Sequence, residues 1–261
     1  MNNHNSNEIK FKVQQQFGAN AKKYVESKSH SSGEDLKMLL EWTDPKESWT
    51  VLDIATGGGH VTKLIAPHVH QVIATDITRE MLQEAKRFVD LTVSNVNYIV
   101  ADAESLPFLD DTFDLVTCRI AAHHFPNAKE FIKEAHRVLK PDGRLLLVDN
   151  IAPSEPQLDE FINTLEQLRD QSHVRCYSQN EWQSWIDEAG FGLVKANVRK
   201  KQLEYQSWVE RTTSSNEQIS KVALYIQAAE KQVKDYFDIQ LTRNAIQSFK
   251  LDELIALIEK K

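Results

Sequence analysis

The sequence predicts an α/β protein built on a doubly wound, mostly parallel sheet. Between about residues 50 and 150, short runs rich in β-branched residues alternate with longer helical stretches, the pattern of β-α-β units. The apolar run just before the glycines at 57–59 predicts the first strand. Four further strands are expected at 71–76, 97–102, 113–119 and 143–150. Because these runs are apolar almost throughout, we expect helices to cover both faces of the sheet.

Helices are predicted between and around these strands. The apolar periodicity indicates one or two amphipathic helices within residues 8–42, and further helices at 78–92, 128–140, 158–170, 178–191 and 215–236. Ser178 is the expected N-cap of the helix at 178–191, with Glu181 three residues on and Gly190 as its terminator. Residues 191–208 have the pattern of a sixth strand. The last segment is ambiguous, because Leu251, Leu254 and Ile258 fit a helix whereas alternate residues fit a strand.

The composition is that of a globular protein that buries a substantial core. The chain has 261 residues, of which 41% are hydrophobic and 26% charged, with a formal net charge of −7. Affinity for nucleic acid comes largely from clustered Lys and Arg, so the negative charge argues against such a partner. Cys118 and Cys176 are far apart, so neither a disulfide framework nor a metal site is expected. With no signal-peptide pattern and no integral membrane segment, we expect a cytoplasmic protein.

Three consecutive glycines follow the first strand. In an open parallel sheet, ligands bind beyond the carboxyl ends of the strands, and the first strand-to-helix turn is the usual contact. Gly57, Gly58 and Gly59 occupy that turn, where they permit positive φ and let the backbone approach a ligand at a helix N-terminus. A glycine run is also compatible with a plain tight turn, so the neighbouring acids decide between the two interpretations.

Acids follow three consecutive strands. Asp76 closes the second strand, where a carboxylate can accept hydrogen bonds from ribose hydroxyls. Asp102, Ala103 and Glu104 follow the third strand, where a carboxylate and a backbone N–H can contact an adenine edge. Together with Asp53 these acids suit a ligand with ribose and adenine but would repel a pyrophosphate. A nicotinamide-dependent oxidoreductase stays an alternative, although Thr62 stands where its fingerprint requires a third glycine.

Five ordered segments resemble a known family. The segments VLDIATGGG, ATDITREML, VADAESLPF, FDLVTCRIAAHHF and RVLKPDGRLLLVD resemble those of class I S-adenosylmethionine-dependent methyltransferases. The resemblance covers about residues 45–150 and is to the small-molecule branch, methyltransferase type 11, which includes quinone-biosynthesis methyltransferases. Ala55 stands in the first glycine place of the family's Asp-x-Gly-x-Gly-x-Gly pattern, a change that quinone-type members tolerate.

The resemblance implies a fold and a division of the chain. The family's Rossmann-like sheet has seven strands, mostly parallel, with an antiparallel last strand inserted between the fifth and sixth. On this ground we expect a strand at 247–258. Residues 1–45 are expected to form a helical N-terminal cover and residues 46–151 the S-adenosylmethionine-binding core. Residues 152–261 are expected to add substrate-side helices and the final strands of the same domain.

The resemblance also implies S-adenosyl-L-methionine as cofactor, with S-adenosyl-L-homocysteine as product. Residues of the glycine turn would surround the methionyl part, Asp76 would hold the ribose, and Asp102 would meet the adenine amino group. Met81 would pack near the adenine, or else serve as an ordinary core residue of its helix. The candidate cofactor contacts are Asp53, Ala55, Thr56, Gly57, Gly59, Asp76, Ile77, Met81, Asp102, Ala103, Glu104 and Ile120.

Histidines follow the fourth strand, near the expected position of the methyl group. Histidine is the commonest general base at neutral pH, so His124 is the candidate catalytic residue, with His123 as a pocket candidate beside it. Both histidines could instead fix the loop by hydrogen bonds. Because the methyl donor already carries an excellent leaving group, alignment of the reactants supplies much of the catalysis, and a base is not always needed.

Further candidates for the substrate pocket lie outside the core segment. His173 and Arg175 could anchor an anionic or carbonyl-bearing substrate, or form a cap or surface salt bridge. Phe17 and Tyr24 could form an aromatic lid over a sulfonium cation, or pack within their helix. Trp208 and Arg211 could border the acceptor cavity, although Trp208 also fits a partly buried anchor.

These patterns predict a small-molecule methyltransferase. The acceptor is expected to be a partly apolar metabolite, by analogy a quinone-like one, and a homodimer is one assembly open to the chain. A non-catalytic S-adenosylmethionine-binding protein shares every cofactor motif and stays an alternative. Base methylation of nucleic acid is not expected, because the fourth strand runs into CRIAAHHF, without the Asp/Asn-Pro-Pro-aromatic motif of amino-methylating enzymes.

Overall fold

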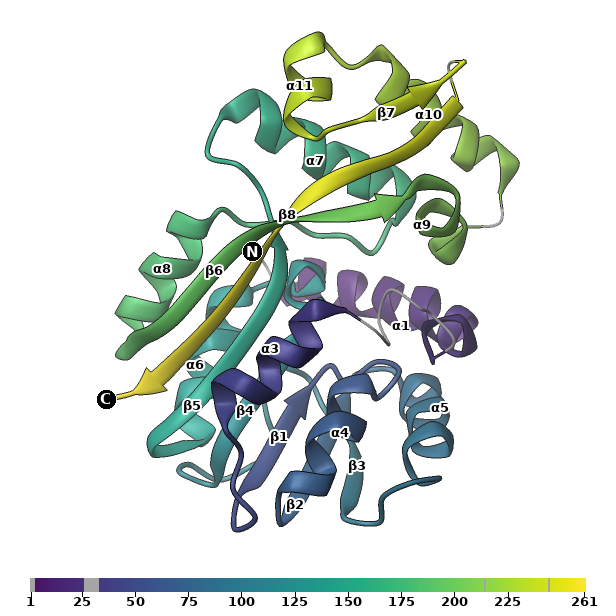
Figure 1. The fold of residues 1–261 in the computed structure, drawn as a ribbon. Helices are drawn as coiled ribbons and strands as arrows, with labels where there is room; N and C mark the ends of the chain where they lie inside the picture. The colour runs from purple at the N-terminus through teal and green to yellow at the C-terminus, as the bar shows by residue number, and fades with distance from the viewer. Residues whose placement is uncertain (1–2, 26–32, 214, 244) are drawn as a thin grey trace.

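The protein is an α/β sandwich around one mixed sheet (Figure 1). Its structure is a computed structural model that describes residues 3–25, 33–213, 215–243 and 245–261. The described residues form an eight-stranded sheet of order β3-β2-β1-β4-β5-β8-β6, in which β7 pairs with β8 at one end. The strands are β1 (Thr50–Ile54), β2 (Gln71–Asp76), β3 (Val96–Val100), β4 (Phe113–Arg119), β5 (Leu139–Ile151), β6 (Phe191–Glu204), β7 (Gln240–Thr242) and β8 (Ala245–Lys260).

The strand directions confirm the predicted architecture. Strands β1 to β5 run parallel to one another, whereas β8 lies antiparallel between β5 and β6. The ambiguous tail is therefore the inserted antiparallel strand. Its burial explains the ambiguity, because residues 251–258 are buried on both faces of the sheet and show no alternation of apolar and polar residues.

Two details of the predicted sheet are wrong. The sheet has an eighth strand, β7, which consists of three exposed residues and has no apolar alternation that a sequence reading could detect. The predicted strand at 191–208 ends at Glu204, and helix α9 (Tyr205–Thr212) begins there. In this helix Tyr205, Trp208 and Val209 are buried, a spacing of three and four residues that marks one helical face.

Helices cover both faces of the sheet. On one face, α3 (Glu34–Thr43) and α4 (His60–Ile65) pack against β1, β2, β4 and β5. On the other face, α6 (Ala128–Val138) and α8 (Gln179–Glu188) pack against β1, β4, β5 and β8. The predicted capping box of Ser178 and Glu181 is present at the start of α8. Helix α5 (Arg79–Val89) follows β2, and two short 3-10 turns lie at 66–68 and 122–124.

A second apolar cluster lies beyond the carboxyl ends of the parallel strands. It joins α7 (Pro156–Arg169), α9, α10 (Asn216–Ala228) and α11 (Lys231–Tyr236) to the extended ends of β6 and β8. Helix α1 (Asn3–Val25) lies between this helical group and the sheet (Figure 1) and contacts α5 and α9. Residues 8–42 thus contain two helices, with 26–32 outside the described residues. None of the described helices has the length and hydropathy of a membrane span.

A buried ion-pair network fixes α3 to the sheet. Asp35 is 1% exposed and pairs with Arg119 at the end of β4 and with Arg199 on β6, the latter at 3.1 Å. Arg199 also contacts Glu253 at 2.6 Å, and Glu253 in turn binds Lys201 at 2.6 Å. Because these carboxylates are buried, each depends on its cationic partners, and removing one acid leaves an uncompensated buried charge.

Asp35→Ala is therefore expected to lower the free energy of unfolding by about 3 to 5 kcal/mol, because Arg119 and Arg199 both lose a buried carboxylate. Urea denaturation followed by circular dichroism measures this loss. Glu34→Ala is the matched control, since the neighbouring Glu34 also pairs with Arg199 but its side chain is 85% exposed. The control is expected to cost less than about 1 kcal/mol. Equal losses in the two variants would contradict the account of a buried network.

Candidate active site

The glycine turn is organised by the buried carboxylate of Asp53. This residue is the last but one of β1 and is 1% exposed. It accepts hydrogen bonds from the hydroxyls of Thr56, Thr62 and Thr117 at 2.6, 2.7 and 2.7 Å. The three hydroxyls come from the turn, from α4 and from β4. Burial raises the pKa of Asp53, although the threonine hydroxyls oppose this effect. Asp53 therefore fixes the turn through side-chain contacts within the protein.

The turn has the backbone conformation that the glycines were expected to permit. Gly57 and Gly59 have φ of 55° and 79°, and Ala55 has a φ of 51°, in the left-handed region that favours glycine. The glycines differ in what surrounds them. A Cβ on Gly59 would lie 2.8 Å from Val89 of α5, so Gly59 is needed for helix packing. Gly57 instead lies on the wall of a pocket.

A pocket with an empty volume of about 1000 Å³ lies at the carboxyl ends of β1 to β4. All the predicted cofactor contacts except Gly59 line it, namely Asp53, Ala55, Thr56, Gly57, Asp76, Ile77, Met81, Asp102, Ala103, Glu104 and Ile120. We call it the first pocket. Residues from four different loops thus converge on one cavity, as the order of strands in the sheet requires.

Asp76 presents a carboxylate in the wall of the first pocket. One of its oxygens accepts the backbone N–H of Gly57 at 3.1 Å, and the other accepts that of Thr78 at 2.8 Å. A carboxylate has about four acceptor positions, so it retains capacity for further donors. Burial raises the pKa of Asp76 to about 6, partly offset by the two backbone N–H groups. The group is therefore ionised at neutral pH and accepts hydrogen bonds from a ligand.

Helix α1 closes one side of the first pocket. Lys10 reaches across from α1 and contacts Asp102 and Glu104 at 2.6 Å each. Phe17 and Tyr24 of the same helix line the pocket, with ring centroids 5.1 Å apart. Sequence reasoning missed Lys10, because nothing in its surroundings in the chain links it to acids more than 90 residues away. Gly58, which was expected to permit positive φ with its neighbours, does not have a positive φ, and a Cβ there would lie 3.1 Å from the backbone of Tyr24.

The loop after β4 is strained and buried. Ile120 has a φ of 54°, a rare conformation for a β-branched residue, and such outliers concentrate at functional sites. His123 and His124 follow it and are 6% and 8% exposed. His123 Nδ1 lies 2.5 Å from a carboxylate oxygen of Asp149, the acid near the end of β5. Burial disfavours the charged ring, but the Asp149 carboxylate outweighs it and raises the pKa of His123.

His124 differs from His123 in its electrostatics. Burial and the neighbouring His123 lower the pKa of His124 to about 4, so the ring is neutral at neutral pH. Its Nδ1 lies 3.0 Å from the backbone carbonyl oxygen of Ser172, which can only accept a hydrogen bond. The proton is therefore assigned to Nδ1, which leaves Nε2 with a free lone pair. The Phe17 ring packs edge-on against His124 at 4.9 Å.

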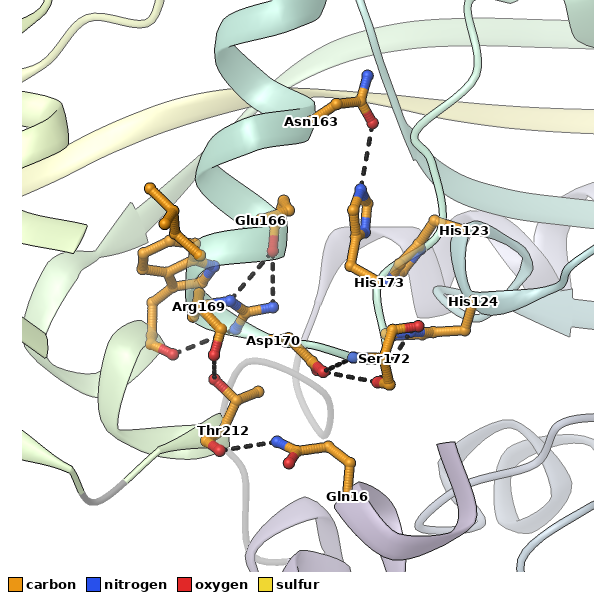
Figure 2. Close-up of polar contacts among 12 residues, drawn as sticks. Gln16, His123, His124, Asn163, Glu166, Arg169, Asp170, Ser172, His173 and Thr212 are labelled. Atoms are coloured by element: carbon orange, nitrogen blue, oxygen red, sulfur yellow. Dashed lines mark hydrogen bonds and ion pairs between the residues drawn. The ribbon is translucent and has the colours of Figure 1, made fainter. Parts of the chain in front are cut away.

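A third histidine completes this cluster. Figure 2 shows His123, His124 and His173 gathered beside α7, with the His173 ring directed at Asn163. His173 Nε2 lies 3.1 Å from the Asn163 side-chain oxygen. Burial, together with His123 and His124, lowers the pKa of His173 well below its ordinary value. His173 does not line the first pocket, and its ring lies 5.7 Å from that of His123 and 6.3 Å from that of His124, between centroids.

A second pocket adjoins the first. It has an empty volume of about 520 Å³, and five residues of its wall were candidates for the substrate pocket: Phe17, Tyr24, His123, Trp208 and Arg211. Phe17, Tyr24, Ile120 and His124 line both pockets. The two cavities therefore meet at the strained loop and α1. Arg175 lies in neither wall, because its guanidinium pairs with Asp159 at 3.1 Å and Glu181 at 3.7 Å.

Other residues on or near the second pocket were not candidates in the sequence analysis. Arg169 pairs with Glu166 at 2.8 Å, and its guanidinium lies 4.4 Å from the centroid of the Trp208 ring. Gln16 of α1 donates a hydrogen bond at 2.7 Å to the backbone oxygen of Thr212, which ties α1 to α9 (Figure 2). Asp149 could have been found, because it lies near the end of a predicted strand, as Asp76 does.

Comparisons with known proteins agree with this arrangement. The methyltransferase domain family matches residues 52–147. YcgJ of Bacillus subtilis, an uncharacterised methyltransferase, is 38% identical over 229 residues, which cover 87% of this chain and 90% of that protein. A crystal structure of a Bacillus halodurans protein described as a methyltransferase superimposes with a TM-score of 0.84 at 38% identity, covering 87% of this chain and 99% of that one.

A shorter stretch of the chain is similar to a methyltransferase of quinone biosynthesis. UbiE of Rickettsia typhi, a ubiquinone/menaquinone biosynthesis C-methyltransferase, is 35% identical over 125 residues, covering 45% of this chain and 50% of that protein. The YcgJ alignment is the more informative one, because it spans nearly the whole of both proteins. Because of this similarity, together with the sheet order and the pocket at the strand ends, we conclude that the chain belongs to the class I S-adenosylmethionine-dependent methyltransferases.

Proposed function

We propose that the first pocket binds S-adenosylmethionine and that the second receives a small-molecule methyl acceptor. The observation that carries this proposal is the Asp76 carboxylate in the pocket wall, beside the glycine turn and the acid after β3. Asp76 accepts hydrogen bonds from the ribose hydroxyls, and Asp102 with the Ala103 amide contacts the adenine. The turn from Ala55 to Gly57 lies against the methionyl part. Met81 and Ile77 supply apolar contact to the base.

Bound in this way, S-adenosylmethionine supplies a methyl group on a positively charged sulfur. The residues around the second pocket hold the acceptor nucleophile in line with that methyl group, which is the main requirement of the reaction. Phe17 and Tyr24 of α1 lie over the junction of the pockets and exclude water from it. Their aromatic faces also favour a neighbouring cation.

His124 is proposed as the proton acceptor for the nucleophile. It lines both pockets, its ring is neutral, and the hydrogen bond from Nδ1 to the Ser172 carbonyl leaves Nε2 free to take a proton. A pKa of about 4 makes it a weak base before substrate binds. An acceptor anion beside it would stabilise the protonated ring and raise that pKa. His123, held by Asp149, positions the loop and takes no proton from the nucleophile.

The acceptor is proposed to be a small, partly apolar metabolite. The second pocket includes Ile120, Leu203 and Trp208 among its lining residues, and such apolar side chains line most small-molecule sites. A quinone-like ring is one acceptor of this kind, and the resemblance to UbiE over part of the chain supports it. Transfer to nucleic acid has no comparable support, given the net charge of −7.

Asp76→Asn is expected to weaken binding of S-adenosylhomocysteine by about tenfold or more, because ribose hydroxyls lose a charged acceptor. Isothermal titration calorimetry of wild type and variant measures the change. In the wild type, affinity is expected to fall as the pH drops through about 6, because the ligand prefers the ionised carboxylate. The Asn variant is expected to lose this pH dependence.

Asp90→Asn is the matched control, since Asp90 follows α5 and its side chain is 38% exposed in a pair with Lys86. It is expected to bind S-adenosylhomocysteine as the wild type does. An Asp76→Asn variant with wild-type affinity at neutral pH would contradict the assignment of Asp76 to the ribose.

The protonation state of His124 can be measured without knowing the acceptor. NMR of protein labelled in its histidine rings, with His124→Gln to assign the signal, is expected to give a pKa of about 4 and a proton on Nδ1. His123 is expected to titrate at a higher pH than an ordinary histidine, because Asp149 stabilises its charged form. A proton on Nε2 at neutral pH would exclude the proposed role, because Nε2 would then have no lone pair to accept the proton of the nucleophile.

A further inference from the structure

The second pocket contains an arginine without a partner. Arg211 lies in the last turn of α9 and is half-buried. Within the described part of the chain its guanidinium makes no hydrogen bond and no ion pair, and Glu166, the acid that acts on it, is already bound to Arg169. Burial and the nearby Arg169 lower the pKa of Arg211. An arginine stays charged in proteins, so this is a guanidinium that needs an anion.

The surrounding wall offers positive charge and no acid. Arg169, Lys201 and Arg211 line the second pocket together with His123 and His124, and the described residues of this wall include no Asp or Glu. Two of the three cations already have partners, since Arg169 binds Glu166 at 2.8 Å and Lys201 binds Glu253 at 2.6 Å. Arg211 is therefore the cation of this wall for which the described residues provide neither a hydrogen bond nor an ion pair.

We propose that the methyl acceptor is a small organic monoanion whose carboxylate is bound by Arg211. This inference rests on the proposed function, because it names the class of molecule that the second pocket receives. The planar guanidinium fork of Arg211 fits a carboxylate with two parallel hydrogen bonds. A phosphate dianion is disfavoured, since one unpaired cation balances only one negative charge.

The rest of the pocket constrains the other parts of the acceptor. Ile120, Leu203 and the Trp208 ring provide an apolar wall, which suits a hydrocarbon or aromatic body. His124 and Ile120 lie at the junction with the first pocket, so the nucleophilic atom lies at that junction. The acceptor therefore carries its nucleophile and its carboxylate at separate positions, joined by an apolar frame.

Its existing ion pairs make Arg175 a weaker candidate than Arg211 for binding the acceptor carboxylate. Both arginines were expected near the acceptor, but Arg175 already has Asp159 and Glu181 as partners and lies outside the pocket wall. A carboxylate at Arg175 would have to displace acids that are already bound. At Arg211 it would instead pair with a guanidinium that has no hydrogen bond or ion pair among the described residues.

Benzoate and its neutral isostere benzamide test this proposal. Each is titrated at millimolar concentration into the full chain saturated with S-adenosylhomocysteine, with binding followed by ligand-observed NMR. Wild type is expected to bind benzoate about tenfold or more tightly than benzamide, because only benzoate forms the charge-assisted pair. Arg211→Gln is expected to bind the two probes equally while retaining its affinity for S-adenosylhomocysteine.

Arg87→Gln is the matched control, because Arg87 on α5 pairs with Glu84 and its side chain is 72% exposed. It is expected to keep the preference for benzoate. Equal binding of the two probes to wild type, absence of benzoate binding, tighter binding of phenyl phosphate than of benzoate, or an unchanged preference in Arg211→Gln would each overturn the inference. Failure of S-adenosylhomocysteine to bind wild type would instead contradict the proposed function, so the two failures are distinguishable.

Discussion

The buried carboxylate of Asp53 is the constraint on which the rest of the site depends. A charge inside a protein is strongly destabilising unless it is hydrogen-bonded, and this carboxylate accepts three hydrogen bonds. The donors are threonine hydroxyls from the glycine turn, from α4 and from β4. Because one acid joins three segments, the turn cannot move without breaking buried hydrogen bonds. Its left-handed residues are held in place by the same contacts.

The fixed turn positions the acid at the end of the neighbouring strand β2. The Gly57 N–H donates to Asp76, so the position of the proposed ribose acceptor follows from the conformation of the turn. On the other side of β1, Thr117 connects Asp53 to β4, whose end leads into the strained residue Ile120 and the histidine loop. Asp149 then holds His123 and thereby the position of His124. Cofactor side and acceptor side thus share one chain of buried contacts.

The sequence predicts well what depends on local patterns. Apolar runs gave the strands β2 and β4 with their observed bounds, and Ser178 with Glu181 marked the start of α8. The acids at strand ends were detectable because the ends of parallel strands meet at one edge, which is a property of the fold. Asp76 and Asp102 could be placed in one pocket on that basis. The division of the chain at residues 45 and 151 stays a prediction.

Features that depend on distant contacts were not predictable from one sequence. Lys10 resembles any exposed lysine of an amphipathic helix until α1 is placed over the acids after β3. Gly59 has the pattern of a ligand-binding glycine, yet its neighbours are Ala85 and Val89 of α5. Arg211 and Arg175 are equivalent in the sequence, and only the positions of the surrounding acids separate them. Pairing of charges is decided by packing, which residue spacing does not encode.

A crystal structure of the complex with S-adenosylhomocysteine tests the central claim most directly. The account predicts that the ligand lies in the first pocket, with both ribose hydroxyls on Asp76 and the adenine beside Asp102 and Ala103. Its sulfur is predicted to face the junction with the second pocket, on the side of His124. A ligand bound elsewhere, or one whose sulfur points away from His124 and the second pocket, would contradict the account.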